Sequence, residues 1–272
     1  MGGTAEQQTS TTDALNRLKS YFTPSTINLR VEVTIGNLGN TGTLGSSSAG
    51  FSQRSDNLFY AAPLFNFLQG NDLAGATTSI TISMNNNSTV NWGYGTGAPG
   101  SGNYSWQTVV THEILHSMGF YDGVADNTGA LANAGYTIFD SLTVRNLAMP
   151  VNFTSYTTNA DRLAAILSND LFWNGAFGKA ANGGAPVKLY APATFESGST
   201  YSHIDPSQTG IGGTLFPALD ANVFFEGPTA VELGIMRDLG WSVSAVPEPS
   251  TYVLILGVAS LAFVAVRRRR AT

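Results

Sequence analysis

The stretch His112-Glu113-Ile114-Leu115-His116-Ser117-Met118-Gly119-Phe120 contains two of the three histidines in the chain. Residues 107–118 carry apolar side chains at helical spacing, and Gly119 is a natural end for a helix. Residues four apart lie on the same face of a helix, so both imidazoles can reach one metal ion. Glu113 then sits beside the open coordination position. The pattern therefore predicts a metal-binding helix with the arrangement of a zinc hydrolase.

A catalytic metal site of this kind normally takes three protein ligands and leaves the fourth position to water. Two residues compete for the third place: His203, the remaining histidine, and Asp122, which lies shortly after Gly119. Imidazole suits zinc, and three nitrogen ligands leave an open site, so His203 is the preferred ligand. Asp122 stays as the alternative, although Asp122-Gly123 is also ordinary turn chemistry.

The composition narrows the class of protein. The chain has 272 residues, of which 43% are hydrophobic and 30 are glycine, and this indicates a loop-rich α+β protein. It has no cysteine, so disulfides and thiolate ligands are excluded and the metal must be held by nitrogen and oxygen atoms. The formal net charge is −5, and no basic patch for nucleic acid is visible.

Hydrophobic periodicity predicts the elements around the motif helix. Helices are expected at residues 13–22, 57–68, 159–167 and 228–239, and a strand at residues 27–35. Pro228 suits the first turn of the last helix. The Gly/Ser/Thr/Asn run at residues 36–50 is expected to be a loop, a glycine-rich connection covers residues 93–102, and a Gly/Ala/Pro-rich segment covers residues 174–192.

Three further sequence motifs lie downstream of the motif helix. The sequence continues with Ser202-His203-Ile204-Asp205, then Leu215-Phe216-Pro217-Ala218, then Ala230-Val231-Glu232-Leu233-Gly234-Ile235-Met236-Arg237-Asp238-Leu239-Gly240-Trp241. With the HExxHxxG helix, residues 77–241 resemble the leishmanolysin-like branch of the metzincins. The resemblance implies a zincin fold, with an N-terminal lobe (residues 1–119) of twisted sheet and active-site helix, and a more irregular C-terminal lobe (residues 120–243).

The resemblance also implies an activity: a Zn²⁺-dependent endopeptidase acting on protein or peptide substrates. Glu113 would be the general base that takes a proton from the attacking water. The chain departs from the family at Phe216, because the family has a methionine in the turn under the metal. This departure leaves open an alternative, a catalytically weak or inactive metal-binding surface or matrix protein that keeps the fold as a structural or adhesive module.

The segment Thr77–Met84 alternates apolar residues and predicts a strand before the motif helix. In zincin proteases an extended substrate adds itself to a sheet edge beside the metal. Thr78, Ile80 and Ile82 are therefore expected on a substrate-binding edge strand. An internal strand without substrate contact is the alternative.

The C-terminal segment, residues 244–272, has a composition of its own. Pro247-Glu248-Pro249 is followed by an apolar run at residues 251–266 and by four arginines at residues 267–270. As a helix the run would span about 24 Å, which is shorter than a hydrocarbon core of about 30 Å. Flanking arginines can compensate for the missing length by snorkelling. A transmembrane helix with a cytoplasmic C-terminus is expected.

This order of features resembles the PEP-CTERM sorting signal of Gram-negative bacteria. The resemblance implies export, an inner-membrane anchor at residues 251–266, processing by an exosortase-type enzyme near Pro247, and then a cell-surface or extracellular location. A simple permanent anchor is the alternative. Residues 1–20 lack a charged start followed by an apolar stretch, so no secretory signal peptide is predicted there, and the export signal is expected upstream.

Overall fold

The computed structural model describes residues 3–23, 29–39, 42–70, 79–208, 211 and 213–244. The described chain is a mixed α+β protein, as the composition predicts. Its helices are α1 (Ala5–Ser20), α2 (Ala62–Gln69), α3 (Trp106–Ser117), α4 (Ile138–Ser141), α5 (Asn159–Ile166), α6 (Ala176–Ala181) and α7 (Ala230–Leu239), with a 3₁₀ turn at Phe153–Ser155. Its strands are β1 (Arg30–Gly36), β2 (Gly45–Ser48), β3 (Phe51–Gln53), β4 (Phe59–Ala61), β5 (Ser79–Asn85), β6 (Trp92–Gly93), β7 (Tyr104–Ser105), β8 (Thr143–Arg145), β9 (Val151–Asn152), β10 (Leu171–Trp173) and β11 (Val187–Lys188).

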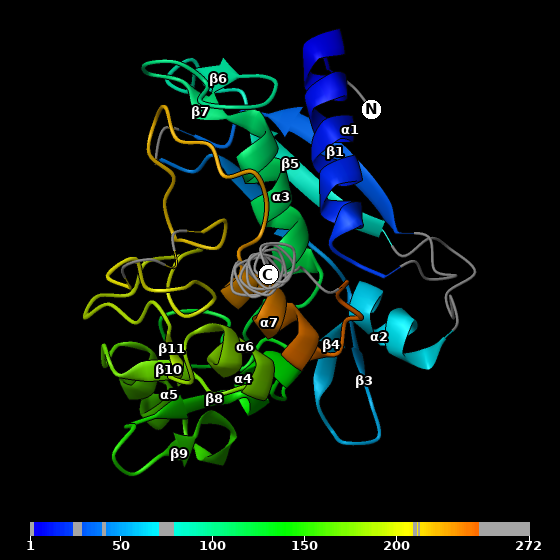
Figure 1. Ribbon diagram of the computed structural model, residues 1–272. Helices are drawn as coiled ribbons and strands as arrows, with labels where there is room; N and C mark the ends of the chain where they lie inside the picture. Colours follow the sequence, from blue (N-terminus) through cyan, green and yellow to red (C-terminus); the bar gives the residue numbers. More distant parts are fainter. Residues whose placement is uncertain are drawn as a thin grey trace, which may run out of the picture.

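A three-stranded sheet supports the motif helix. Its order is β1-β5-β2, with β1 parallel and β2 antiparallel to β5. Helix α3 contacts β2, β5 and α1, and Figure 1 shows these elements together in the upper part of the molecule. Ile80, Ile82 and Met84 of β5 are fully buried, and burial of such side chains contributes about 1.5–3 kcal/mol each. The sheet and α3 therefore share one core.

The prediction that Thr77–Met84 forms the substrate-binding edge is wrong in position. The strand exists as β5, but it is paired on both sides, so Ile80 and Ile82 lie in the centre of the sheet, and Thr78 lies outside the described residues. Within the described residues, the edge next to α3 is β2, in the run expected to be a loop. The sequence Gly-Ser-Ser-Ser has no apolar alternation, and pairing with β5 makes it a strand.

The elements from α4 to β11 form the lower part of the molecule in Figure 1, whereas the short strands β6 and β7 lie at its top. An antiparallel sheet of order β11-β10-β8-β9 lies there with α4, α5 and α6. Helix α7 packs on α6. The Asp238 carboxylate of α7 accepts hydrogen bonds from the backbone N–H groups of Phe177 (2.8 Å) and Gly178 (2.8 Å) and from Trp173 Nε1 (3.0 Å). The Gly/Ala/Pro-rich segment is thus partly regular, since it contains α6 and β11.

Local capping explains where several helices differ from the periodicity. Helix α1 begins earlier than expected because Thr4 and Gln7 form a capping box. Helix α2 is shorter than residues 57–68, since β4 comes first and Pro63 stands in the first turn. Helix α7 begins after the N-cap Thr229, so Pro228 precedes the helix instead of lying in its first turn. Gly70 and Gly240 end α2 and α7 in the left-handed conformation.

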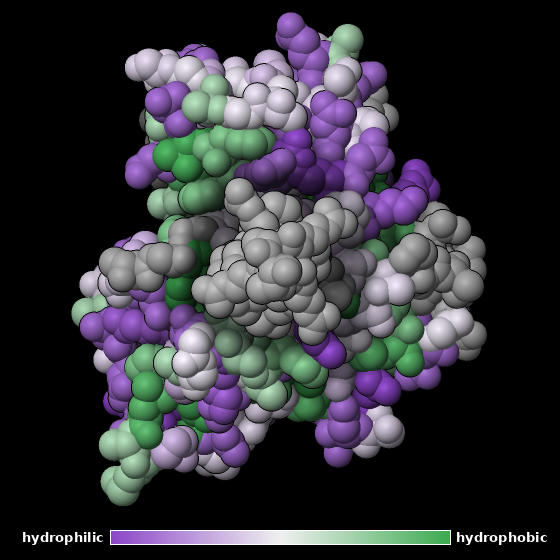
Figure 2. Space-filling model, in the orientation of Figure 1, coloured by the Kyte–Doolittle hydropathy of each residue, from purple (hydrophilic) through white to green (hydrophobic). Residues whose placement is uncertain are grey.

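The outer surface of α1 is polar, and Figure 2 shows hydrophilic side chains along it. Among the described helices, none has the length and apolar character needed to cross a membrane. The predicted transmembrane helix at residues 251–266 and the motif Pro247-Glu248-Pro249 lie outside the described residues.

Candidate metal centre

Helix α3 is held rigidly inside the protein. The Ser105 side chain caps it by accepting from Thr108 N (3.2 Å), and every residue of the helix except His112 is buried. Gly119 follows with φ +115°, and a Cβ there would lie 3.1 Å from Leu64 Cδ2. A residue other than glycine would therefore be strained at this turn. The motif side chains are presented from a fixed backbone.

The structure brings the three histidines together. Nε2 of His116 lies 2.9 Å from Nε2 of His112 and 3.2 Å from Nε2 of His203, and the latter two atoms are 3.3 Å apart. Among the described residues, this trio is the group of metal-ligating side chains close enough to share one ion. His203 thus joins the motif helix from a loop that lies 87 residues after His116 in the chain.

The hydrogen-bond partner of each Nδ1 atom determines the tautomer of the three histidine rings. His112 Nδ1 lies 2.6 Å from Thr214 O, His116 Nδ1 lies 2.8 Å from Phe120 O, and His203 Nδ1 lies 2.8 Å from Ser199 O. A carbonyl oxygen only accepts hydrogen bonds, so each Nδ1 carries the proton. In a neutral ring the Nε2 atom then has a lone pair and no hydrogen, so the three Nε2 atoms form a donor set that could hold one metal ion.

Burial favours the neutral form of His116 and His203. It lowers the pKa of His116 to about 3 and that of His203 well below its ordinary value, and the neighbouring histidines lower both further. Protons therefore do not compete for the lone pairs of these two rings at neutral pH. The donor set fits a divalent ion that accepts imidazole ligands, and nothing in the geometry selects zinc over others of that kind.

Glu113 lies beside the trio with its side chain buried. Burial raises its pKa above the ordinary range, while the charge of His112 and a hydrogen bond with Ser47 of β2 lower it in part. Gly45 of β2 is also close, because a Cβ there would be 3.1 Å from Glu113 Oε1. The carboxyl group is thus placed between the metal-binding face of α3 and the sheet edge.

Asp122, the alternative third ligand, lies outside the histidine trio. Its carboxylate accepts hydrogen bonds from the Ser202 hydroxyl and from Val124 N (2.7 Å), and its own N–H donates to Ser202 Oγ at 3.0 Å. Burial, and then the charge of Asp140, raises its pKa to about 7. Asp122 therefore ties the exit of α3 to the residue before His203.

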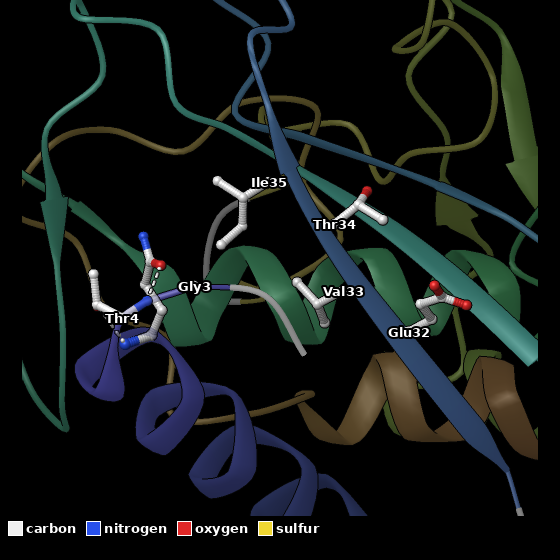
Figure 3. A pocket seen from close by; sticks show the side chains of 7 residues that line it. Gly3, Thr4, Glu32, Val33, Thr34 and Ile35 are labelled. Atoms are coloured by element: carbon white, nitrogen blue, oxygen red, sulfur yellow. Dashed lines mark hydrogen bonds between the residues drawn. The ribbon is translucent and has the colours of Figure 1, made fainter.

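A cleft of about 580 Å³ opens over the trio. It is lined by His112, His116, His203 and Glu113, by residues 42–47 around β2, and by Phe216 and its neighbours 217–219. Phe216 is half-buried and packs against the core. A second hollow, between the start of α1 and β1, is lined by Gly3, Thr4, Gln7 and residues 32–35 (Figure 3). Glu32 is the acidic group lining that hollow, and no histidine lines it, whereas the histidine trio and Glu113 line the first cleft.

Sequence reasoning missed the backbone groups that orient the ligands. The carbonyls of Phe120, Ser199 and Thr214 leave no trace in side-chain patterns. It also missed the edge strand β2 and the acid Glu232. The capping-box spacing of Thr229 and Glu232 could have pointed to Glu232 as a buried carboxylate at the start of α7.

Residues 245–270 match the PEP-CTERM protein-sorting motif. The sorting signal predicted from Pro247, Glu248 and Pro249 is confirmed. The motif implies recognition by an exosortase-type enzyme, and it indicates export and sorting to the cell surface in a Gram-negative bacterium. The match covers the C-terminal segment alone. No curated protein matches the chain.

Proposed function

We propose that the protein is an exported zinc endopeptidase of the metzincin type. The observation that carries the proposal is the cluster of three imidazole Nε2 atoms, which lie 2.9–3.3 Å from one another beside the buried carboxyl group of Glu113. A purely structural zinc site is normally closed by four protein ligands. Here three ligands leave a position free, and it faces an open cleft.

The three histidines and Glu113 have different roles in the proposed reaction. His112, His116 and His203 would hold the ion, which supplies Lewis acidity that polarises a peptide carbonyl and makes a water molecule more acidic. Glu113 accepts the proton of that water at a carboxylate oxygen as the water oxygen bonds to the carbonyl carbon. Glu113 then returns the proton to the amide nitrogen as the C–N bond breaks. Its burial supports this role, because a raised pKa suits proton transfer near neutral pH.

The sheet edge supports a peptide as substrate. β2 pairs with β5 on one side, and residues 44–47 line the cleft on the other. An extended peptide can add to such an edge through main-chain hydrogen bonds and so cross the metal site. The substrate-binding edge predicted for Thr78, Ile80 and Ile82 is therefore reassigned to β2.

The C-terminal segment supports an exported location for the proposed enzyme. The sorting motif supports export, and the proposal adds that residues 251–266 hold the chain in the inner membrane before exosortase-type processing. Recovery of the unprocessed chain from membranes, and of a shortened chain outside the cell, is the corresponding measurement.

Glu113→Gln tests the proposal. The variant is expected to bind one zinc ion per chain, as the wild type does, and to lose at least about 100-fold in cleavage of an unfolded protein such as casein, the lower range for a lost general base. Undiminished cleavage by this variant would refute the role of Glu113. Zinc binding without any cleavage by the wild type would favour the alternative, a structural or adhesive metal-binding module.

A further inference from the structure

The turn at residues 213–217 connects to two of the three proposed ligands. Thr214 O accepts from His112 Nδ1 at 2.6 Å. Leu215 O accepts from Ile204 N at 2.9 Å, directly after His203 in the chain. A movement of this turn would therefore displace ligands that lie on two separate parts of the fold.

A buried carboxylate on α7 holds the turn in place through hydrogen bonds. Glu232 has no exposed surface, and its Oε1 accepts from Leu215 N at 2.5 Å while its Oε2 accepts from Thr229 N at 2.7 Å. The N–H of Thr214 also donates to this carboxylate. Gly213 permits the close approach, because a Cβ there would lie 2.4 Å from Oε1. Both oxygens are thus occupied by backbone N–H groups.

We infer that Glu232 is a positioning residue for the metal site, which fixes the Thr214 carbonyl against His112 Nδ1 and the Leu215 carbonyl against the backbone N–H of Ile204, the residue after His203. The inference rests on the proposed metal site and deepens it. A carboxylate that accepts from N–H groups on both oxygens cannot be replaced by an amide, which offers one oxygen and turns an NH₂ group toward the other donor. Glutamine is an ordinary capping-box partner, so its oxygen keeps the hydrogen bond from Thr229 N while its NH₂ group faces Leu215 N and pushes the turn away.

The chain offers a matched control on the same helix. Asp238 is another carboxylate of α7 whose two oxygens accept from N–H groups, and its partners are in α6 and β10. Glu232→Gln and Asp238→Asn therefore make the same chemical change. Each leaves an N–H group facing an NH₂ group and destabilises the fold to a similar extent. Only Glu232 is connected to the proposed ligands.

The experiment measures zinc affinity by competition with a chromophoric chelator, and records the visible spectrum of the Co²⁺-loaded protein as a report on ligand geometry. No peptide is present, so the result does not depend on peptidase activity. We expect Glu232→Gln to lower zinc affinity about 10–100-fold, as loss of a partner of a ligating histidine does, and to change the Co²⁺ spectrum. Asp238→Asn is expected to leave both unchanged.

Wild-type zinc affinity and spectrum in a folded Glu232→Gln protein would overturn the inference, and so would an equal loss in Asp238→Asn. Gly213→Ala is the second variant if Glu232→Gln does not fold, because its methyl group presses on the same carboxylate. It should also weaken zinc binding, and unchanged binding would count against the inference. Weakened binding in a protein that never cleaves casein would leave the inference standing and refute the peptidase.

Discussion

Replacement of Gly45 by alanine tests whether β2 and Glu113 work together. A Cβ at this position would lie 2.9 Å from Val109 Cγ1, 3.1 Å from Glu113 Oε1 and 3.2 Å from Glu113 Cγ. Ordinary contacts begin near 3.4 Å, so Val109 must move by about 0.5 Å and Glu113 by about 0.2–0.3 Å. Since a misplacement of about 1 Å costs about 100-fold in rate, a displacement of Glu113 by about 0.3 Å corresponds to about 4-fold in kcat.

The effect on stability is smaller than the effect on rate. Overpacking costs about 1–3 kcal/mol, and replacing glycine by alanine returns about 0.4–1 kcal/mol through the unfolded chain. A net loss of at most about 2.5 kcal/mol in the free energy of unfolding is expected. The zinc affinity should stay at the wild-type level, because the three histidines are not contacted.

The assay compares kcat for a casein-derived peptide, zinc affinity and the unfolding midpoint among the wild type, Gly45→Ala and Gly36→Ala. Gly36 is the control because it also lies in a strand of this sheet, and a Cβ there meets nothing within 4 Å. Gly36→Ala should keep the wild-type kcat. A Gly45→Ala protein with a kcat within twofold of the wild type would refute the close apposition of β2 and Glu113.

Two further predictions concern the acids and the third ligand. His203→Ala should lose stoichiometric zinc while Asp122→Asn retains it, as measured by metal analysis after dialysis, and the opposite result would make Asp122 the ligand. Burial raises the pKa of Asp140 to about 6, so this carboxyl group stabilises the fold fully below pH about 3.8 and loses that contribution as the pH rises through about 6. Asp140→Asn should flatten the pH dependence of the metal-free unfolding free energy between pH 4 and 7 by up to about 3 kcal/mol, and an unchanged slope in chemical denaturation would contradict the burial argument.

The sequence predicts those parts of the fold that depend on local chemistry. The motif helix was expected at residues 107–118 and is α3, Trp106–Ser117, because its apolar spacing, its polar N-cap and the following glycine act within one segment. Helix α5 follows its prediction for the same reason. Strand β2 could not be predicted, because Gly45-Ser46-Ser47-Ser48 has no pattern of its own and becomes a strand through pairing with β5. The order of strands is likewise set by tertiary contacts.

The proposed ligands could be found from side chains, whereas their orientation could not. Each histidine is oriented by a backbone carbonyl, and the three carbonyls belong to the exit of α3, to the loop before His203 and to the turn held by Glu232. Any residue type supplies a carbonyl, so these positions carry no motif. The backbone that carries these carbonyls is nevertheless held by residues whose type matters. They are Gly119 at the end of α3, Ser202 with Asp122, and Gly213 with Glu232. These backbone contacts hold each ring at Nδ1 and direct the three Nε2 atoms toward one point, where the proposed ion would bind.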